Sequence, residues 1–381
     1  MSREVGAYNA LTSFYYGIKQ LQKERANLKI LAFGDLHAHP FKDFSTTDEV
    51  TGNTRLTAIV KTLEYMGEYA RDNGIDLILD AGDIFHKRNN IDTVTYNSIF
   101  EAVKNISDEG TPIVMIPGNH TQVDNSDFPE TSIEPFGEIE NVSVLKEFSS
   151  YSMGEFDVDI YPAPYSKNAD MVKKYIEGYA KEAESNKPRK SILLGHLGVT
   201  NAEIGKGSFT MEDAFTVDDL KPDVFDWVVL GHFHKRQTFK KFGHPNAFYT
   251  GNPIQHNFND EGQAKGFMVI DTDKGEAEFV EIPNKQFLTV TDLKDIENTN
   301  TDDYFIRYQI TEDQLEELEE KLPDESDHRI ELTKDYDEDR RMDLDFSNSF
   351  TEMVEEYATS LERPDVIDIG KTIINEATQE V

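Results

Sequence analysis

The chain has 381 residues, of which 38% are hydrophobic and 11% aromatic, so it can bury a core and is not a disordered protein. A single core stops growing at roughly 250 to 300 residues, so this length predicts one large domain with a smaller appendage. The absence of cysteine excludes disulfide scaffolds, thiolate zinc sites and cysteine nucleophiles, and it fits a reducing compartment. A net charge of −35 repels polyanions over most of the surface, which by itself argues against nucleic acid as a partner.

The first part of the chain carries no apolar run of the kind found in export signals. Residues 1–29 mix charged side chains with short apolar stretches, and nothing further along approaches the roughly 20 apolar residues of a membrane span. The expected location is therefore the cytoplasm, without a membrane partner. An apolar stripe predicts an N-terminal helical extension over residues 1–28, which either covers the core or adds to a dimer face. Its members are Leu11, Phe14, Tyr15, Ile18 and Leu21.

Short apolar runs recur along residues 29–288, and they predict buried strands. Each ends in Gly, Asp, Asn or His, so the strands would present polar side chains at one sheet edge. The runs are residues 28–33, 77–79, 113–116, 192–194 and 227–230. Between the first two, apolar residues from Leu56 to Tyr69 recur every three or four positions and predict a helix. This order predicts an α/β domain, and strands broken by Pro and Gly near residues 161–165 and 248–271 predict a mixed sheet.

The character of the chain changes after residue 288. Residues 291–381 contain 29 acidic and 9 basic side chains. Residues 311–322 predict an acidic amphipathic helix, Ser349 and Glu352 form the capping box of a second helix, and a third apolar stripe follows Pro364. Residues 289–381 are therefore predicted to form a small α+β cap and docking segment, whose last helix packs either on the cap or on a partner.

Metal-ligand side chains follow all five predicted strands. A single histidine at such a position is usually an ordinary core residue, but five at strand ends indicate a metal centre. Imidazole and carboxylate ligands with one neutral amide suit Mn²⁺, Fe²⁺ or Zn²⁺, and one carboxylate can bridge two ions. A two-metal centre of this kind hydrolyses phosphoesters without a cysteine or serine nucleophile. The side chains are Asp35, His37, Asp83, Asn119, His120, His196, His232 and His234.

The ordered blocks D-x-H, G-D, G-N-H, G-H and G-H-x-H, spread over residues 28–235, resemble those of the calcineurin-type metallophosphoesterases. The resemblance implies a four-layer α/β/β/α sandwich in which Asp83 bridges two divalent ions and His120 is the catalytic general acid. It also implies two ligand sets. One is Asp35, His37, Asp83 and His234, and the other is Asp83, Asn119, His196 and His232.

The flanks of these blocks resemble the SbcD and Mre-type nucleases of double-strand-break repair. The matching segments are AGDIFH at residues 81–86, GHFHKRQ at 231–237, YTGNPIQ at 249–255 and KGF at 265–267. The resemblance implies a DNA exonuclease and endonuclease that uses two metal ions, with Mn²⁺ expected, and that carries a second catalytic residue, His86, positioning the DNA strand. It further implies an SbcC-type, SMC-like ATPase partner and a homodimer within the complex. The short tail favours a phage-type recombination endonuclease subunit.

Alternatives stay open at several positions. His86 could instead be an ordinary surface histidine, and His39 either reaches the site or has no role in it. Thr121 occupies a position where these nucleases usually carry Asp. The basic pairs at residues 87–88, 235–236 and 240–241 form either a groove for phosphates or ordinary solvated loops. The rival functions are a phosphatase or small-molecule phosphodiesterase using the same metals, and a metal-free scaffold, which would typically have lost ligands.

Overall fold

The computed structural model describes most of the chain. The described residues are 28–204, 209–210, 215–294, 301–322, 328–333, 350–361 and 363–379. The predicted N-terminal helical extension and the capping residue Ser349 lie outside them. The chain divides into two compact units, residues 1–309 with 321–331 and residues 310–320 with 332–381, and each is described by itself. The predicted boundaries at residues 28 and 288 stay a prediction.

The first unit contains two six-stranded sheets. The first has the order β14-β13-β1-β2-β3-β4 and the second has the order β11-β12-β10-β7-β6-β5. The strands of the first are β1 (Lys29–Phe33), β2 (Leu77–Asp80), β3 (Ile113–Met115), β4 (Val142–Val144), β13 (Gly266–Asp271) and β14 (Glu276–Glu281). Those of the second are β5 (Tyr151–Met153), β6 (Val158–Ala163), β7 (Lys190–His196), β10 (Trp227–Gly231), β11 (Gln237–Phe239) and β12 (His244–Tyr249).

Both sheets are mixed, as the sequence predicted. β1, β2, β3 and β4 run parallel, whereas β13 and β14 are antiparallel to their neighbours. In the second sheet β6, β7, β10 and β12 are parallel, and β5 and β11 are antiparallel edge strands. The five predicted strands are thus divided between two sheets. The expectation that their polar side chains lie at the edge of one sheet was wrong, because these side chains follow the carboxyl ends of strands in both sheets.

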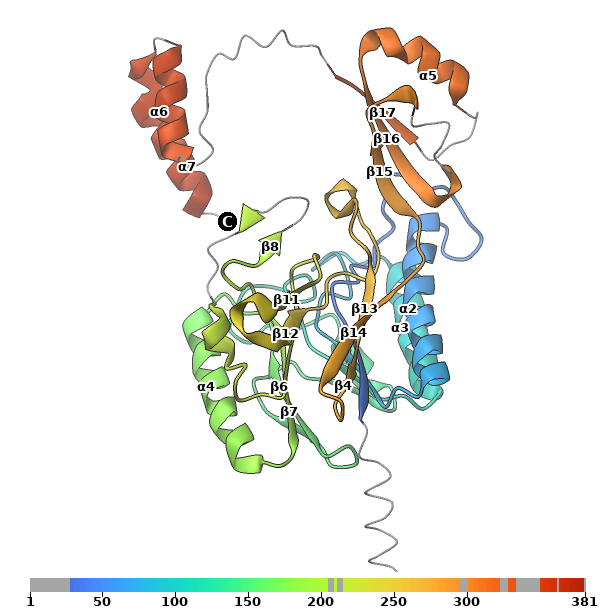
Figure 1. The fold of residues 1–381 in the computed structure, drawn as a ribbon, viewed down its shortest axis with the longest axis vertical. Helices are drawn as coiled ribbons and strands as arrows, with labels where there is room; N and C mark the ends of the chain where they lie inside the picture. The colour runs from blue at the N-terminus through green and yellow to red at the C-terminus, as the bar shows by residue number, and fades with distance from the viewer. Residues whose placement is uncertain are drawn as a thin grey trace, which may run out of the picture. The chain divides into compact units, whose positions relative to one another are not determined.

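The helices and sheets of this unit form layers (Figure 1), and three clusters of buried apolar side chains pack between them. Alternate residues of β1 point to opposite faces, so Leu31 and Phe33 pack with α2 (Thr54–Asn73) and α3 (Thr93–Asp108), while Ile30 and Ala32 pack between the sheets. On the far side of the second sheet, Leu193 packs with α4 (Ala169–Asn186). This order of helices, sheet, sheet and helix confirms the α/β/β/α sandwich.

Helix α2 forms where the apolar stripe predicted it. Asn53 caps its start by accepting a hydrogen bond from the N–H of Leu56, and Gly74, with a φ of 63°, ends it in the left-handed conformation. Leu56, Ile59 and Leu63 lie on its buried face. The loop before this helix is therefore fixed at the edge where β1 ends.

The remaining described elements are small. The strands are the hairpin β8 (Glu203–Ile204) with β9 (Phe209–Thr210), and a sheet of β15 (Gln286–Val290), β16 (Tyr304–Ile310) and β17 (His328–Leu332). The helices are α5 (Leu315–Lys321), α6 (Phe350–Ser360) and α7 (Ile367–Gln379). Short 3-10 turns cover Glu134–Glu138, Val217–Leu220, Lys240–Phe242, Phe258–Asp260, Thr301–Asp303, Glu312–Gln314 and Pro364–Val366.

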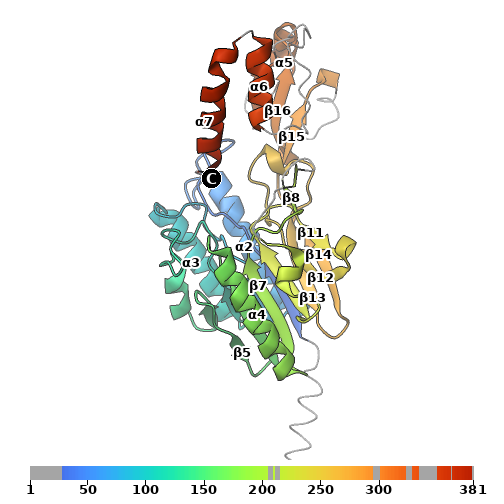
Figure 2. The same ribbon diagram turned by 90° about the vertical axis from the view of Figure 1, so that its left-hand side faces the viewer.

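The last two helices pack against each other (Figure 2). A Cβ on Gly370 would lie 2.6 Å from Cγ1 of Val354, and Lys371 pairs with Glu355. The predicted last helix thus packs within its own unit, while Ile369 and Ile373 stay exposed on it. The helix predicted over residues 311–322 is found as a capped 3-10 turn followed by α5. Among the described helices, none has the length and apolar character needed to cross a membrane.

Candidate metal centre

The loops that follow β1 and β2 run side by side and carry the first predicted ligands. The N–H of Asp35 donates to the carbonyl of Gly82 at 2.8 Å, and that of His37 donates to the carbonyl of Asp83 at 2.9 Å. Parallel strands that end at the same level, joined by these hydrogen bonds, hold the carboxylates of Asp35 and Asp83 within 4.8 Å of each other.

One donor cluster contains Asp35, His37 and His234. The Nε2 atoms of His37 and His234 lie 3.0 Å apart, and Oδ1 of Asp35 lies 3.8 Å from Nε2 of His37. The backbone N–H of His232 donates to Oδ2 of Asp35 at 2.9 Å, which ties the loop after β10 to the loop after β1. Residues from both sheets therefore meet in this cluster.

The second donor cluster contains Asp83, Asn119, His196 and His232. Nε2 of His196 lies 3.1 Å from Oδ2 of Asp83 and 3.1 Å from Oδ1 of Asn119. Nδ1 of His232 lies 3.2 Å from the same Asn119 oxygen. All seven predicted ligands are thus brought together, and Asp83 lies within reach of both clusters.

The protonation of His196 shows that this second cluster fits a cation. Its Nδ1 must donate to the carbonyl of Ala81, 2.8 Å away, because a carbonyl only accepts. The lone pair of Nε2 would then face two acceptor oxygens unless a proton or a metal ion lies between them. Burial alone would lower the pKa of His196, but Asp83, Asp35 and the carbonyl of Ala81 together outweigh burial and raise it to about 9.

Burial and neighbouring charges also shift the pKa values of other groups in the centre. Burial would raise the pKa of Asp83, but the charges of and hydrogen bonds from His196 and His120 together outweigh burial and lower that pKa. Burial raises the pKa of Asp35. Burial, followed by repulsion from His196, lowers the pKa of His232 to about 3, and burial with repulsion from His234 lowers that of His37. The imidazoles of His37 and His232 are therefore neutral and present lone pairs, the form that binds metal.

The backbone is strained at the predicted ligands. Among the described residues, nine non-glycine residues have a positive φ, and four of these are predicted ligands. Such conformations cost about 1 to 3 kcal/mol each and gather at functional sites. The four are Asp35 (55°), His37 (48°), Asp83 (60°) and His232 (105°).

Gly118 leaves room for the carboxylate of Asp83, the predicted bridging ligand. A Cβ at this position would lie 2.3 Å from Oδ1 of Asp83 and 2.7 Å from Cε1 of His196. Neither side chain could keep its place beside a larger residue, so the glycine before Asn119 is required by close approach.

The predicted catalytic residues His120 and His86 lie beside the first cluster. Nδ1 of His120 donates to the carbonyl of His86 at 2.6 Å, and the two rings stack at 5.6 Å. Ligand atoms of His37, His86 and His120 all lie within 4.8 Å of one another. Burial, followed by repulsion from His120, lowers the pKa of His86 to about 4. His39 is half-buried, with its ring 5.3 Å from that of His86, so it neighbours the site without joining either donor cluster.

The segment after the last ligand block supports the loop of His234. The ammonium group of Lys265 is buried and donates to the carbonyl of His234 at 2.9 Å and to Oδ1 of Asp260 at 2.9 Å. It also contacts Asn252, whose amide donates to Oδ2 of Asp260 at 3.2 Å. The residues that resemble SbcD after the last ligand block therefore act here as a buried support.

One carboxylate partly neutralises the basic pairs at residues 235–236 and 240–241, for which the sequence left a phosphate groove or solvated loops open. Lys235 and Lys241 both pair with Glu203, at 2.5 Å and 3.7 Å, and Arg236 stacks on the ring of Phe279 at 4.2 Å. Arg88 donates to the carbonyl of Asn119 at 2.6 Å and so supports a predicted ligand.

Thr121, which departs from the resembled pattern, closes the turn that carries Asn119 and His120. Its hydroxyl donates to the carbonyl of Gly118 at 3.1 Å and lies 3.0 Å from that residue's N–H. These hydrogen bonds join the side chain of Thr121 to Gly118 and to none of the predicted ligands. Its role is therefore to shape the turn.

Two buried residues near the centre were missed by sequence reasoning. Asp80 lies at the end of β2, and His256 follows the run at residues 249–255 that was matched to the nucleases. The ring of His256 lies 5.7 Å from that of His37, between centroids. Burial lowers the pKa of His256 to about 3. The missed signal was a histidine directly after the matched run.

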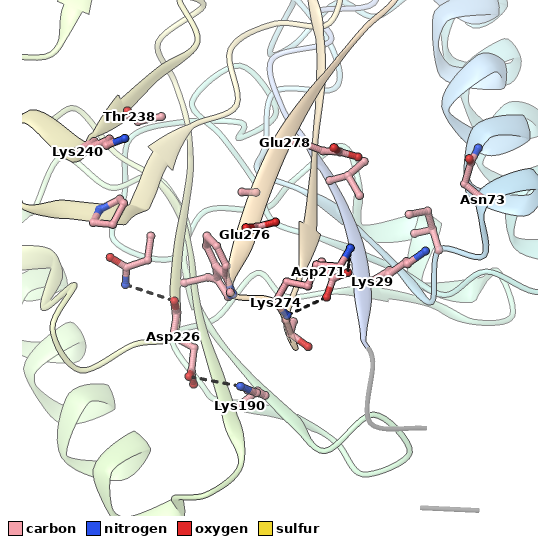
Figure 3. Close-up of a pocket in the computed structure, with 18 of the residues that line it drawn as sticks. Lys29, Asn73, Lys190, Asp226, Thr238, Lys240, Asp271, Lys274, Glu276 and Glu278 are labelled. Atoms are coloured by element: carbon pink, nitrogen blue, oxygen red, sulfur yellow. Dashed lines mark hydrogen bonds and ion pairs between the residues drawn. The ribbon is translucent and has the colours of Figure 1, made fainter. Parts of the chain in front are cut away.

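A separate cavity of about 680 Å³ lies away from the histidines (Figure 3). It is lined by Lys29, Lys190 and Trp227, which begin β1, β7 and β10, whereas the predicted ligands follow the other ends of these strands. Its charges are balanced by pairs such as Lys274 with Asp271 at 3.1 Å. The candidate centre is therefore not in this cavity.

Curated relatives include nucleases of phage and bacteria. The chain is 25% identical to exonuclease subunit 1 of Enterobacteria phage T4 over 90% of this chain and 94% of that protein. It is 25% identical to the SbcD subunit of the nuclease SbcCD of Bacillus subtilis over 61% of this chain and 66% of that protein, and 24% identical to the Staphylococcus epidermidis protein of the same name over 58% and 61%. The chain thus matches less than two thirds of the length of the bacterial relatives.

The sequence profile of the calcineurin-like phosphoesterases matches residues 28–236. This segment covers more than half of the chain and contains every predicted ligand. The profile match agrees with the two mixed sheets and with the gathering of Asp and His residues at their carboxyl ends. The chain belongs to the calcineurin-like phosphoesterase family.

Proposed function

We propose that this protein is a two-metal-dependent DNA exonuclease and endonuclease, the nuclease subunit of an SbcCD-like recombination and repair complex. The observation that carries the proposal is that seven predicted ligands, drawn from five strand ends, form two donor clusters with Asp83 in reach of both. A scaffold that had lost its chemistry would not keep this set complete.

Two divalent ions, with Mn²⁺ as the expected species, would be held by these residues. Asp35, His37, Asp83 and His234 would hold one ion. Asp83, Asn119, His196 and His232 would hold the other. When bound, such a pair clamps a phosphoryl oxygen and lowers the pKa of a bound water. Mixed imidazole, carboxylate and amide donors fit Mn²⁺.

His120 is placed to move a proton. Since its Nδ1 donates to the carbonyl of His86, its Nε2 is the atom that exchanges a proton with a leaving oxygen. Its backbone N–H donates to Oδ1 of Asp83 at 2.8 Å, which fixes the loop beside the bridging carboxylate. The imidazole thus has one tautomer and a fixed position before substrate arrives.

DNA is the proposed substrate because the similarity continues beyond the ligands. The phage relative is named an exonuclease subunit, the bacterial relatives are named nuclease subunits, and the phage match extends over 90% of this chain. His86 stacks on His120 and is half-buried at the site, where it can position a strand. If His86 were an ordinary surface histidine, this stacking on the predicted general acid would not be expected.

The proposed partner is an SbcC-type ATPase, because the bacterial relatives are named as subunits of a two-component nuclease. The hairpin of α6 and α7 offers exposed apolar side chains to such a partner. A homodimer within the complex is part of the same proposal. The exposed side chains are Tyr357, Leu361, Ile369 and Ile373.

Hydrolysis by the purified chain in Mn²⁺ tests the proposal, with linear double-stranded DNA compared against bis-p-nitrophenyl phosphate. Asp83→Ala should abolish both reactions, and His86→Ser should impair DNA cleavage. His244→Ser is the matched control, because His244 lies on β12 and pairs with Asp223 at 3.4 Å. Turnover of the small ester that survives His86→Ser, with DNA left intact even beside an ATPase partner, would instead support a small-molecule phosphodiesterase.

A further inference from the structure

His256 is a buried histidine whose ring has no hydrogen-bond partner among the described residues. It is 6% exposed, and both Nδ1 and Nε2 are unpaired. Its backbone, in contrast, is fixed, because its N–H donates to Oδ2 of Asp260 at 2.9 Å and its carbonyl accepts from Arg55 at 3.0 Å. The backbone of His256 is thus held in place, while its imidazole makes no hydrogen bond among the described residues.

The ring faces the first donor cluster. Its centroid lies 5.7 Å from that of His37, with the ring planes at 86°, and 6.1 Å from that of His234. The ring of Phe41 lies 5.4 Å away and offers no strong hydrogen-bonding group. Two predicted ligands, His37 and His234, are therefore among the rings that surround His256.

His37 lacks a partner on its outer nitrogen. Its Nε2 faces His234 and Asp35, while its Nδ1 is buried and unpaired among the described residues. His196, in the other cluster, has such a partner, since its Nδ1 donates to the carbonyl of Ala81. Metal-binding histidines nearly always donate their second N–H to a carbonyl, a carboxylate or a water, which fixes the tautomer.

One buried water would satisfy both residues. An unpaired buried donor or acceptor costs about 1 to 3 kcal/mol, and buried waters typically make about three hydrogen bonds to such groups. The rings of His37 and His256 are neighbours, with centroids 5.7 Å apart, and each carries a buried nitrogen that lacks a partner among the described residues. The water would accept from Nδ1 of His37 and donate to the unprotonated nitrogen of His256.

We propose that His256 is a positioning residue of the first metal ion: through one buried water it keeps the proton of His37 on Nδ1, so that Nε2 presents its lone pair to the ion. The inference rests on the proposed function, because it takes His37 as a ligand. A histidine that merely fills the core would be replaced by an apolar ring without consequence for the metal.

Mn²⁺ binding to the full chain tests this, measured by titration calorimetry and by the paramagnetic resonance signal of free Mn²⁺. His256→Phe removes both nitrogens at similar size, and His256→Gln keeps a group that donates and accepts. Tyr179→Phe is the matched control, since the Tyr179 hydroxyl is also buried and unpaired but belongs to the core beside α4. Losing an outer hydrogen-bond partner typically costs about 10 to 100-fold in metal affinity.

His256→Phe is expected to bind Mn²⁺ about 10 to 100-fold more weakly than the unaltered chain. The affinity of His256→Gln should stay within about threefold of that of the unaltered chain, and the affinity of Tyr179→Phe should not change. Unchanged affinity in a folded His256→Phe protein overturns the inference, as does an equal loss in the Phe and Gln variants, which would assign the effect to shape. If the Phe variant does not fold, His256→Leu takes its place. An unaltered chain that binds no Mn²⁺ would overturn the proposed function itself, which is a separate outcome.

Discussion

Asp80 is a buried carboxyl group whose ionisation should set the pH dependence of stability in the metal-free protein. Its Oδ1 accepts from the N–H of Gly82 at 3.0 Å, and its Oδ2 has no hydrogen-bond partner among the described residues. Burial raises the pKa of Asp80 to about 8, and the neighbouring Asp35 adds to the effect against the Gly82 hydrogen bond. The group is therefore neutral in the folded protein at pH 7 but ionised in the unfolded chain.

The sign of the effect follows from proton binding. Because the folded pKa is higher than the unfolded one, the folded state binds the extra proton, and its stabilisation is complete below about pH 4 and lost as pH rises towards 8. One proton gives a limiting slope of about 1.4 kcal/mol per pH unit. Asp80→Asn keeps an acceptor for Gly82 and cannot ionise, so it removes this slope.

Urea unfolding in EDTA at pH 5, 6 and 7 measures this directly. The free energy of unfolding of Asp80→Asn minus that of the unaltered chain should grow by about 2 to 3 kcal/mol between pH 5 and 7. His196 and Asp83 are present in both proteins, so the difference isolates Asp80. A difference that stays constant within about 0.5 kcal/mol over this range would refute the reasoning, because the native and unfolded chains would then ionise Asp80 alike.

Three further predictions concern the centre and its support. Gly118→Ala should weaken Mn²⁺ binding at least tenfold in a folded protein, because its Cβ would lie 2.3 Å from Oδ1 of Asp83; unchanged calorimetric affinity would contradict this. Mn²⁺ affinity should rise with pH by up to about tenfold per unit below pH 9, since binding must displace the proton that Asp83 stabilises on His196, and a flat profile would contradict it. Lys265→Met should lower the free energy of unfolding by about 3 to 5 kcal/mol, since it leaves the buried carboxylate of Asp260 without its ion-pair partner. In urea unfolding, Lys265→Met combined with Asp260→Leu should recover much of that loss, and no recovery would show that the pair is not the cause.

The predicted ligands could be found from the sequence because their positions follow local rules. A buried strand has an apolar run, and a polar residue directly after it lies at the sheet edge wherever the strand belongs. The runs that became β1 and β7 are both short and apolar, so no local feature indicated that Ile30 and Ile192 lie in different sheets. The division into two sheets came from the family resemblance, and the structure confirms it.

The contacts that support the centre could not be predicted in this way. Lys265 reaches the carbonyl of His234, and the ring of His256 reaches that of His37, across 31 and 219 positions of the chain. A lysine directly before a strand is usually solvated. Lys265 is buried because segments distant in the sequence pack around it. The pairing of the basic side chains could not be predicted for the same reason, since Glu203, which pairs with both Lys235 and Lys241, lies on β8, 32 positions before Lys235.

This neutralisation bears on how so acidic a chain would hold DNA. Lys235 and Lys241 share the single carboxylate of Glu203, whereas Lys265 has Asp260 to itself, so these three lysines together leave one positive charge uncompensated. Two bound divalent ions would bring more positive charge to the site than these lysines do. Affinity for DNA ends should accordingly depend on the ions more than on surface lysines, and a chain with a net charge of −35 would need a partner for the rest of the duplex.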